Sequence, residues 1–421
     1  MINKKSIEHL KTMTFEGFIK PDYEKYCFSN IPYTIFSYLA ENGNRHNLLP
    51  QDTAIDAKKK YDKVIFILID AFGWNLLEMF SDSFPVLKEL LVNGKTSKLT
   101  SQFPSTTTAE ITTLHSGMQV QQHGIMEWFY YEPEFDDIFA PFMYRLPAQK
   151  NTVLSRTSDT IDKVFDFDNI YSVFKENSIE SFLFMPASIV NSPYTRKAVR
   201  NSIPVSYTTF AQGLSELLQM VTEQEKGYFQ FYYSELDSIC HLYGPYSKEA
   251  QAQLTCFMNS LEEILFKKLP RDGKTLFILS ADHGQTTVKL DQGVYINSME
   301  NVVGALKKNS VARPLVPGGS YRDFFIHVQH NMIDEITSIL AKNLESTAKV
   351  VKTKELIERN FFGSYGASKK FLSRVGDICI LPYQNKGVWW YEEDTFSMDF
   401  KGMHGGLTKE EMEIPYILYE L

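Results

Sequence analysis

The most constraining feature of the sequence is the apolar run VIFILI at residues 64–69, which is followed by Asp70, small residues and a helix-like pattern. This run is far too short to span a bilayer, because a membrane helix needs about 20 apolar residues. A short, continuous apolar run before a turn indicates a strand buried on both faces, and such strands belong to parallel sheets covered by helices. The run therefore predicts an α/β fold.

The same succession of strand, turn and helix recurs along the chain. Further strands are predicted within residues 179–188, 227–237 and 274–284, and the segment SKLTSQFPS leads into a helix that starts near Thr107. Strands that alternate with helices favour a doubly wound, mainly parallel sheet with helices on both faces. We therefore expect one large α/β core.

The pattern changes between residues 285 and 400, where the segments indicate a small α+β insertion, and the core pattern returns at residues 401–421. We therefore predict three parts. They are an N-terminal extension that packs on the core (1–60), an α/β core (61–284 and 401–421) and an inserted cap subdomain (285–400).

Composition and charge exclude several classes of partner. The formal net charge is −8 and the longest basic block is KKK at 58–60, which argues against a nucleic-acid polymer as partner. No apolar run of signal-peptide length follows Met1, and none is long enough to span a membrane. The four cysteines are scattered without a CxxC pair, which is typical of reduced, buried cysteines. We expect a cytoplasmic protein with no membrane partner.

Polar residues that can do chemistry gather at the predicted strand ends, where ligands bind in open α/β sheets. They are Asp70, Thr106, Thr107, Thr108, Asp237, His241, Asp282, His283 and, before the last strand, His404. Some have a purely structural explanation, since Asp70 can cap the following helix. Asp237 and His241 have the i,i+4 spacing of a pair on a helix surface.

The remaining residues of this set favour a site. Asp282 and His283 point to opposite faces of a regular strand, so they converge only if the strand has ended, which Gly284 permits. His404 lies in a glycine-rich loop, where the backbone can approach a ligand closely. Together the set offers three Asp, three His and a hydroxyl. Nitrogen and oxygen ligands without cysteine suit zinc, with manganese as the alternative. Two such ions can activate a nucleophile and hold a phosphoryl group.

A family resemblance joins these residues. The motifs that carry it are, in chain order, ILIDAFGWN, FPSTTTAEITTLHSG, QQHGI, ELDSICHLYGP, SADHG and GMHGGLTKEEM. They resemble the type I phosphodiesterase / nucleotide pyrophosphatase family of the alkaline phosphatase superfamily. Bacterial cytoplasmic members are also similar in GGSYRDFFIHV and RVGDICILP. The resemblance covers residues 62–421 and carries nothing in residues 1–60.

The resemblance implies two divalent ions and a threonine nucleophile. One ion would be held by Asp237, His241 and His404, and the second by Asp70, Asp282 and His283. The family nucleophile is the threonine after FPxx, which is Thr107 here. Its hydroxyl would join the ligands of the second ion and form a covalent phospho-threonine. The resemblance also implies the doubly wound fold with a cap inserted between Asp282-His283 and His404.

Thr107 and Glu110 also fit a capping box at the start of a helix. The two roles of Thr107 are compatible, because a helix N-terminus offers free N–H groups and a positive dipole end to a phosphate. Glu110 departs from the family pattern. Nucleotide pyrophosphatases have an asparagine there that donates a hydrogen bond to the phosphate, and an ionised glutamate cannot donate. Glu110 is therefore our substrate-binding candidate, either turned back to the backbone or facing a donor on the substrate.

These observations predict a two-metal hydrolase of phosphodiesters or phosphoanhydrides that acts on a small-molecule or nucleotide-like substrate. A monoesterase or phosphomutase of the same superfamily is the first alternative, with Arg145 and Arg322 as cations that either bind phosphate or form structural ion pairs. A non-catalytic metal-binding member is the second. A sulfatase lacks its C/S-x-P-x-R context, and no GxGxxG motif supports a dinucleotide-binding oxidoreductase. The aromatic run at 126–131 either stacks on a flat leaving group or packs in the core.

Overall fold

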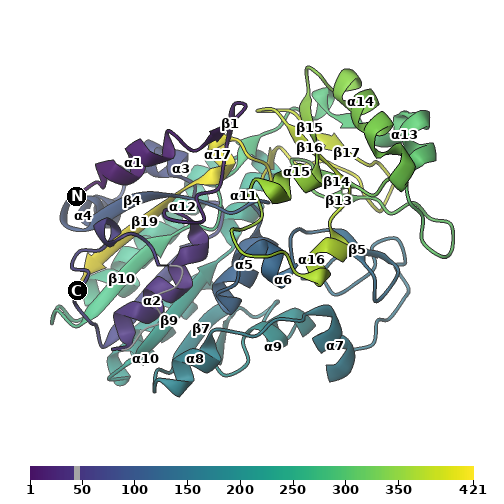
Figure 1. Cartoon of the computed structure of the whole chain (residues 1–421). Helices are drawn as coiled ribbons and strands as arrows, with labels where there is room; N and C mark the ends of the chain where they lie inside the picture. The colour runs from purple at the N-terminus through teal and green to yellow at the C-terminus, as the bar shows by residue number, and fades with distance from the viewer. Residues whose placement is uncertain (42–47) are drawn as a thin grey trace.

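The computed structural model describes residues 1–41 and 48–421, and its centre is a seven-stranded sheet (Figure 1). In sheet order the strands are β4 (Lys95–Thr100), β19 (Glu413–Glu420), β10 (Thr275–Ser280), β3 (Lys63–Ile69), β9 (Gly227–Tyr233), β7 (Ser181–Pro186) and β8 (Ile203–Tyr207). From β10 to β8 all neighbouring strands are parallel. Only β19 runs antiparallel to its two neighbours. The predicted doubly wound, mainly parallel sheet is confirmed.

Helices cover this sheet. They are α2 (Ile31–Leu39), α3 (Trp74–Phe80), α4 (Pro85–Asn93), α5 (Thr107–Ser116), α8 (Tyr171–Glu176), α10 (Phe210–Glu223), α11 (Glu235–Tyr243) and α12 (Lys248–Ser260). Helix α10 packs on β7, β8 and β9, whereas α2 packs on β3 and α8 on β7. The apolar run that predicted a doubly buried strand is β3, in which residues 64–69 are entirely buried. Because helices cover both faces of the sheet, the apolar residues of β3 form an uninterrupted run instead of alternating with polar residues.

The N-terminal segment packs against the sheet and its helices. Helix α1 (Lys4–Leu10) lies on β4, and the N–H of Asn3 donates to the carbonyl of Thr96 at 2.7 Å. Phe28, Ile35 and Phe36 belong to the main hydrophobic core. Residues 1–41 are thus an integral layer of the molecule in this structure.

A second lobe lies beside the C-terminal ends of the sheet strands and is drawn in green to yellow in Figure 1. Its sheet has the order β13 (Gly318–Gly319), β14 (Phe324–Ile326), β16 (Ile378–Pro382) and β15 (Ala348–Lys352), with α13 (Glu300–Ala305), α14 (Ile333–Asn343), α15 (Thr353–Glu358), α16 (Lys369–Arg374) and β17 (Val388–Trp389) around it. The lobe has its own apolar cluster, which runs from Val288 to Met403. It also shares Phe325 and Phe362 with the main core, so the two parts are packed together.

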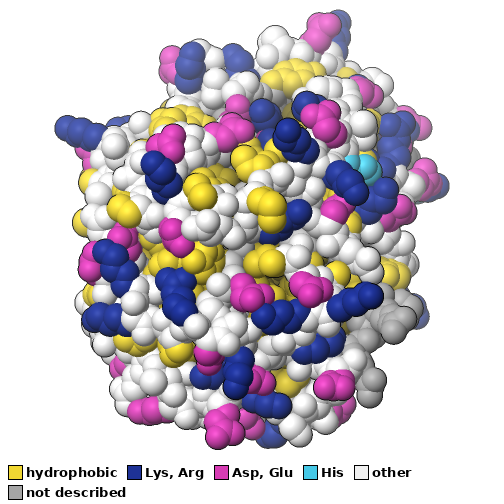
Figure 2. Space-filling view, turned by 90° about the vertical axis from the view of Figure 1, so that its left-hand side faces the viewer, with side chains coloured by type: hydrophobic (Ala, Val, Ile, Leu, Met, Phe, Trp, Pro, Cys, Tyr) yellow, Lys and Arg dark blue, Asp and Glu magenta, His cyan; other side chains and the backbone are white. Residues whose placement is uncertain are grey.

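The surface is mixed in charge. On the face shown in Figure 2, Lys and Arg side chains are interspersed with Asp and Glu and form no basic stripe. Within the described residues, no helix is both long and apolar enough to cross a membrane.

Candidate metal centre and nucleophile

Two parallel strands bring the first acidic residues together. Strands β3 and β10 are neighbours in register, with Leu68 opposite Ser280, so Asp70 and Asp282 follow at the same edge of the sheet. Strand β10 ends at Ser280, and therefore Asp282 and His283 are free of the strand alternation and converge. Gly284 is needed for close approach rather than for a left-handed turn, since a Cβ there would lie 2.1 Å from the carbonyl oxygen of Glu410.

The remaining candidates come from a helix and a distant loop. Asp237 does not end strand β9, as the sequence pattern suggested, because that strand stops at Tyr233 and Asp237 lies in the first turn of α11. One helical turn later His241 points to the same place. His404 arrives from the other side of the cap, after β18 (Gly402–Met403), on a loop tied to the segment before α5 by the Ser105–Gly405 bridge.

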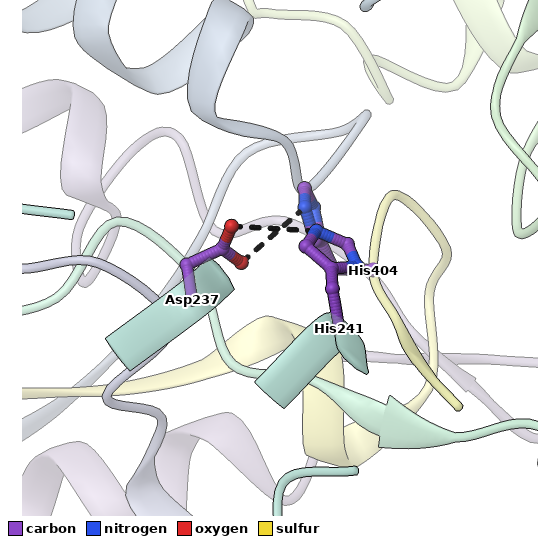
Figure 3. A group of neighbouring side chains, drawn as sticks. All are labelled: Asp237, His241 and His404. Atoms are coloured by element: carbon purple, nitrogen blue, oxygen red, sulfur yellow. Dashed lines mark ion pairs between the residues drawn. The ribbon is translucent and has the colours of Figure 1, made fainter. Parts of the chain in front are cut away.

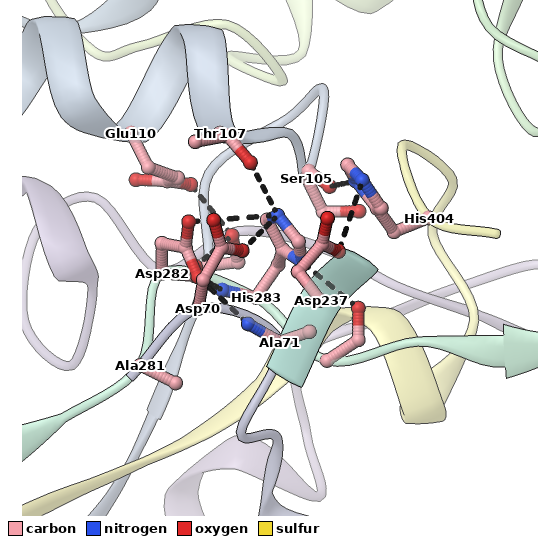
Figure 4. A network of polar contacts seen from close by, with 12 residues as sticks. Asp70, Ala71, Ser105, Thr107, Glu110, Asp237, Ala281, Asp282, His283 and His404 are labelled. Carbon is pink, nitrogen blue, oxygen red and sulfur yellow. Dashed lines mark hydrogen bonds and ion pairs between the residues drawn. The ribbon is translucent and has the colours of Figure 1, made fainter. Parts of the chain in front are cut away.

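The candidate ligands form two groups of three. Figure 3 shows the first group, Asp237, His241 and His404. Figure 4 shows Asp237 and His404 beside the second group, Asp70, Asp282 and His283. Within each group one ligand atom per residue lies within 4.8 Å of the others. The imidazole rings of His283 and His404 stack with centroids 3.7 Å apart, so the groups are adjacent.

The imidazoles are oriented as metal ligands are. The Nδ1 atoms of His241, His283 and His404 lie 2.8–3.0 Å from the backbone carbonyl oxygens of Gly402, Gly284 and Ser105. A carbonyl only accepts, so each Nδ1 carries the hydrogen, and in a neutral ring the Nε2 atom presents its lone pair to the site. Burial lowers the pKa of His283 to about 4 and that of His404 to about 3, which keeps both rings neutral.

The carboxylates of the second group each use one oxygen for the protein and leave the other to the site. The Tyr232 hydroxyl donates to Oδ2 of Asp70 at 2.5 Å, and the N–H groups of Ala71 and His283 donate to Oδ1 of Asp282. The other two oxygens, Oδ1 of Asp70 and Oδ2 of Asp282, are buried without a hydrogen-bond partner, each 3.5 Å from Nε2 of His283. Buried orphan oxygens that face imidazole lone pairs fit a divalent cation.

The electrostatics of the site point the same way. Burial, followed by the repulsion of Asp282 and Asp237, raises the pKa of Asp70 well above its usual value. Burial also raises the pKa of Asp282 to about 6. Asp237 is the exception. Burial is the largest single effect on it, but the attraction and hydrogen bond of His241, together with the attraction of the other two histidines, outweigh burial and lower its pKa. Ionising Asp70 and Asp282 together is therefore unfavourable in this buried site, and a metal ion would relieve that cost.

Thr107 is the threonine that reaches this cluster. It is the first residue of α5, and its Oγ1 lies 3.1 Å from Nε2 of His283 (Figure 4). Thr106 is the N-cap residue, and its side chain makes no capping hydrogen bond. The hydroxyl of Thr108 is buried without a partner. Of the three threonines, Thr107 is the one whose hydroxyl contacts a candidate metal ligand.

The predicted capping box between Thr107 and Glu110 is wrong, because the helix starts one residue earlier than a box on Thr107 requires, with Thr106 as its N-cap. The Glu110 carboxylate turns back to the chain before the helix. It accepts from the backbone N–H and side-chain amide of Gln102 and from the hydroxyl of Ser101. The Ser101 hydroxyl also lies 2.7 Å from the carbonyl oxygen of Asp282. Glu110 is fully buried, and it is absent from the walls of both cavities described below.

Two cavities open from the cluster. The larger, about 510 Å³, includes Thr107, Asp237, His241 and His404 in its wall, together with residues of the cap. The smaller, about 350 Å³, includes Asp70, Thr107 and Asp237 and is walled by residues of the core. Trp128 of the predicted aromatic run lines both, and Phe129 lines the larger, whereas Tyr130 is buried in the core.

The arginine candidates lie elsewhere. Arg322 is fully buried in a two-pronged ion pair with Glu411, at 2.9–3.0 Å, so it is a structural ion pair. Arg145 lines neither cavity and is exposed. Sequence reasoning missed the supporting residues Tyr232 and Gln285, because only the sheet pairing and the loop after β10 bring them to Asp70 and Asp237.

Comparison with known proteins identifies the family and the fold of the chain. The family model described as type I phosphodiesterase / nucleotide pyrophosphatase matches residues 64–407. Murine ectonucleotide pyrophosphatase / phosphodiesterase 5 superposes with a TM-score of 0.62 at 18% identity, covering 84% of this chain and 87% of that one. The human protein of the same name gives 0.63 at 17%, covering 85% and 87%. An inactive murine variant, solved in complex with AMP, gives the same values as the human protein. At these identities the likeness shows the fold. No curated protein matches the chain.

Proposed function

Because the chain belongs to the type I phosphodiesterase / nucleotide pyrophosphatase family, we propose that it is a metal-dependent phosphodiesterase whose nucleophile is Thr107. The observation that carries the proposal is the position of Thr107 Oγ1, 3.1 Å from His283 and within a wall common to both cavities. The family itself supports hydrolysis of phosphoric esters. The nucleophile, the number of ions and their identity are our inference.

The residues present suit two divalent ions, one in each group of three, with zinc expected and manganese as the alternative. Such ions lower the pKa of a nearby hydroxyl and neutralise charge on phosphoryl oxygens. Asp70, Asp282 and His283 would hold the ion beside Thr107, and Asp237, His241 and His404 would hold the other.

The chain's own residues then divide the remaining work. The Oγ1 atom of Thr107 loses its proton and forms a bond to phosphorus. The bond between phosphorus and the leaving oxygen breaks as this bond forms. The N-terminus of α5 directs unpaired N–H groups toward the phosphoryl oxygens as charge shifts onto them. Water then cleaves the phospho-threonine, which restores the hydroxyl and releases the phosphate product.

The cavity walls favour a diester over a monoester. A monoester carries a second negative charge on phosphorus, which superfamily members of that kind meet with added basic residues. No Lys or Arg lines either cavity in the described part of the chain, and Arg322 is committed to Glu411. The neighbour solved with AMP suggests a nucleotide-like substrate as a starting point for assays.

The proposal is tested by turnover of bis(4-nitrophenyl) phosphate and 4-nitrophenyl phosphate after loading with zinc or manganese. We expect metal-dependent cleavage of the diester in preference to the monoester. Thr107→Ala should lose about 10⁴-fold in kcat while its metal content stays unchanged, and Thr106→Ala is the matched control that keeps most activity. Intact mass after a rapid acid quench should show a phosphoryl adduct on the wild-type chain and none on Thr107→Ala. A fully active Thr107→Ala variant excludes this nucleophile, and a metal-loaded protein inert on all esters favours the non-catalytic alternative.

A further inference from the structure

The larger cavity is an apolar chamber between the core and the cap. Its apolar wall consists of Trp128, Phe129, Met143, Leu242, Tyr321, Trp389, Phe396, Met398, Phe400 and Met403. Several of these aromatic rings contact one another, since Phe129 packs edge-on against Phe396 with centroids 5.6 Å apart. The ring of Phe400 lies 4.8 Å from that of His241. The aromatic wall thus reaches the first group of candidate ligands.

The apolar character continues to the rim of the chamber. Met143, Leu242 and Phe400 are 43%, 51% and 39% exposed, and all three line this one cavity. Single exposed apolar side chains are ordinary, but apolar side chains gathered around a concave site mark the binding of an apolar group.

The chamber offers no positive charge of its own. Among the described residues in its wall there is no Lys or Arg. Apart from the candidate ligands Asp237, His241 and His404, the polar side chains there are hydroxyls and the carboxyl of Glu127. Lys401 follows Phe400 in the chain, but its ammonium lies over the ring of Tyr243, 5.9 Å from the centroid. Apart from an ion held by Asp237, His241 and His404, a second anionic group would therefore find no cation in the chamber wall, and it would lie near the carboxyl of Glu127.

The position of Thr107 decides which part of a substrate lies there. Its hydroxyl contacts His283 of the second ligand group, and in-line displacement sends the leaving group away from the attacking oxygen. His241 and His404, which would hold the ion that stabilises the leaving oxygen, line the chamber and are absent from the wall of the smaller cavity. The leaving group thus departs into the chamber, and the smaller cavity takes the ester that stays on phosphorus.

We propose that the chamber binds the leaving alcohol of a phosphodiester and selects an uncharged aromatic alcohol over an anionic leaving group such as a second phosphate. This proposal rests on the proposed function and narrows it, because it makes the enzyme a diesterase that disfavours pyrophosphate bonds. The leaving alcohol stacks among Trp128, Phe129, Trp389 and Phe400, with the phosphate at Thr107.

The test uses two aryl methyl phosphodiesters whose leaving phenols are matched in acidity, one uncharged and one bearing a carboxylate. We expect kcat/KM to be at least about tenfold higher for the uncharged leaving group. Leu242→Lys places an ammonium at the exposed rim and should reduce this ratio by about threefold or more. Val92→Lys is the matched control, since Val92 is 62% exposed on α4, lines neither cavity and should leave the ratio unchanged.

A second measurement is independent of turnover. Trp128 and Trp389 line the chamber, so the uncharged phenol should quench tryptophan fluorescence saturably, and the carboxylated phenol should do so much more weakly. Equal kcat/KM for the two diesters, or equal quenching by the two phenols, overturns the chamber proposal and leaves a working diesterase in place. Selective quenching by a protein that cleaves neither diester overturns the proposed function while the chamber keeps its preference.

Discussion

The two groups of candidate ligands differ in how they are built and how far they are closed off. The side chains of Asp70, Asp282 and His283 are at most 3% exposed, whereas those of Asp237, His241 and His404 are 11–16% exposed. The residues of the buried group directly follow two paired strands, β3 and β10. The open group combines helix α11 with a loop that follows the whole cap. The pairing of two neighbouring strands positions the first group, whereas the second group is complete only when the cap packs against the core.

This difference suggests a division of labour within one site. The buried group contacts Thr107, and its rigid frame suits activation of a nucleophile, which needs a fixed distance. The open group faces the apolar chamber, where a leaving group must arrive and depart. A ligand group that is open to solvent and substrate is held less rigidly than a buried one. The two groups should therefore respond differently to the same chemical change.

The largest contrast is expected when one carboxylate of each group is neutralised. Asp282→Asn should lower kcat/KM for a diester by about 10³-fold, because the Asp282 side chain is fully buried and leaves little room for water to replace the lost ligand. Asp237→Asn should cost about 100-fold, since solvent can complete the coordination of the open group. Both are measured with metal content determined in the same samples.

Asp159→Asn serves as the control for the substitution itself, because that side chain is 76% exposed and lines neither cavity. Equal losses in the two ligand variants, with equal metal contents, contradict the division between a buried and an open group.

The sequence predicted the buried group more completely than its surroundings. Asp70 and Asp282 each follow a continuous apolar run, and a parallel sheet brings such strand ends to one edge, so their meeting follows from local patterns. His404 could be placed only through the family resemblance. Its approach depends on the Ser105–Gly405 bridge and on the packing of the whole cap, and no local pattern encodes either.

Glu110 shows why the helix start was misplaced. The sequence allowed a capping box on Thr107, but the chain enters α5 with Thr106 as N-cap. The Glu110 carboxylate then reaches Gln102, which precedes the helix, because the loop folds back under its first turn. The contacts of Glu110 with the segment before the helix override the local capping motif, and no local sequence pattern predicts them. The predicted limits of the three parts of the chain stay predictions.

Chelation should separate the two groups in time. We expect a chelator to remove the ion of the open group first, because water and chelator reach Asp237 and His241 directly. The buried ion should leave later and lower the thermal midpoint more, since an ion at about 100 times its Kd stabilises the fold by about 2.7 kcal/mol. Metal content and melting temperature are followed together during dialysis. Loss of both ions in a single phase contradicts the expected order, in which the open group loses its ion before the buried group.

The supporting hydrogen bonds should matter more in the buried group. Tyr232→Phe removes the donor to Oδ2 of Asp70 and should weaken metal affinity by about tenfold or more. Gln285→Leu removes the donor to Asp237, and water can replace it, so the loss should stay below about tenfold. Tyr228→Phe, on the same strand as Tyr232, is the matched control because its hydroxyl bonds Gln230 instead. A larger effect of Gln285→Leu than of Tyr232→Phe reverses the expected order.

The smallest effect on activity is expected at Glu110, which supports the buried group through Ser101 and does not face substrate. Glu110→Gln should change kcat/KM of a diester by less than about tenfold, or about 1.4 kcal/mol.

The main effect of Glu110→Gln is expected on the pH dependence of stability instead. Burial raises the pKa of Glu110 to about 8, although hydrogen bonds from Ser101 and Gln102 favour the carboxylate. An unfolded glutamate titrates near ~4.3. The folded chain therefore holds this proton more tightly, and the stability it contributes is complete below the unfolded pKa and is lost as pH rises through about 8. The glutamine variant stays neutral at every pH, so the wild type's unfolding free energy should fall relative to the variant's between about pH 5 and 8 and run parallel to it outside that window. Denaturant unfolding of both proteins at a series of pH values measures this difference. A flat difference across the window means that Glu110 is ionised in the fold, and an activity loss beyond tenfold means that it acts on the substrate after all.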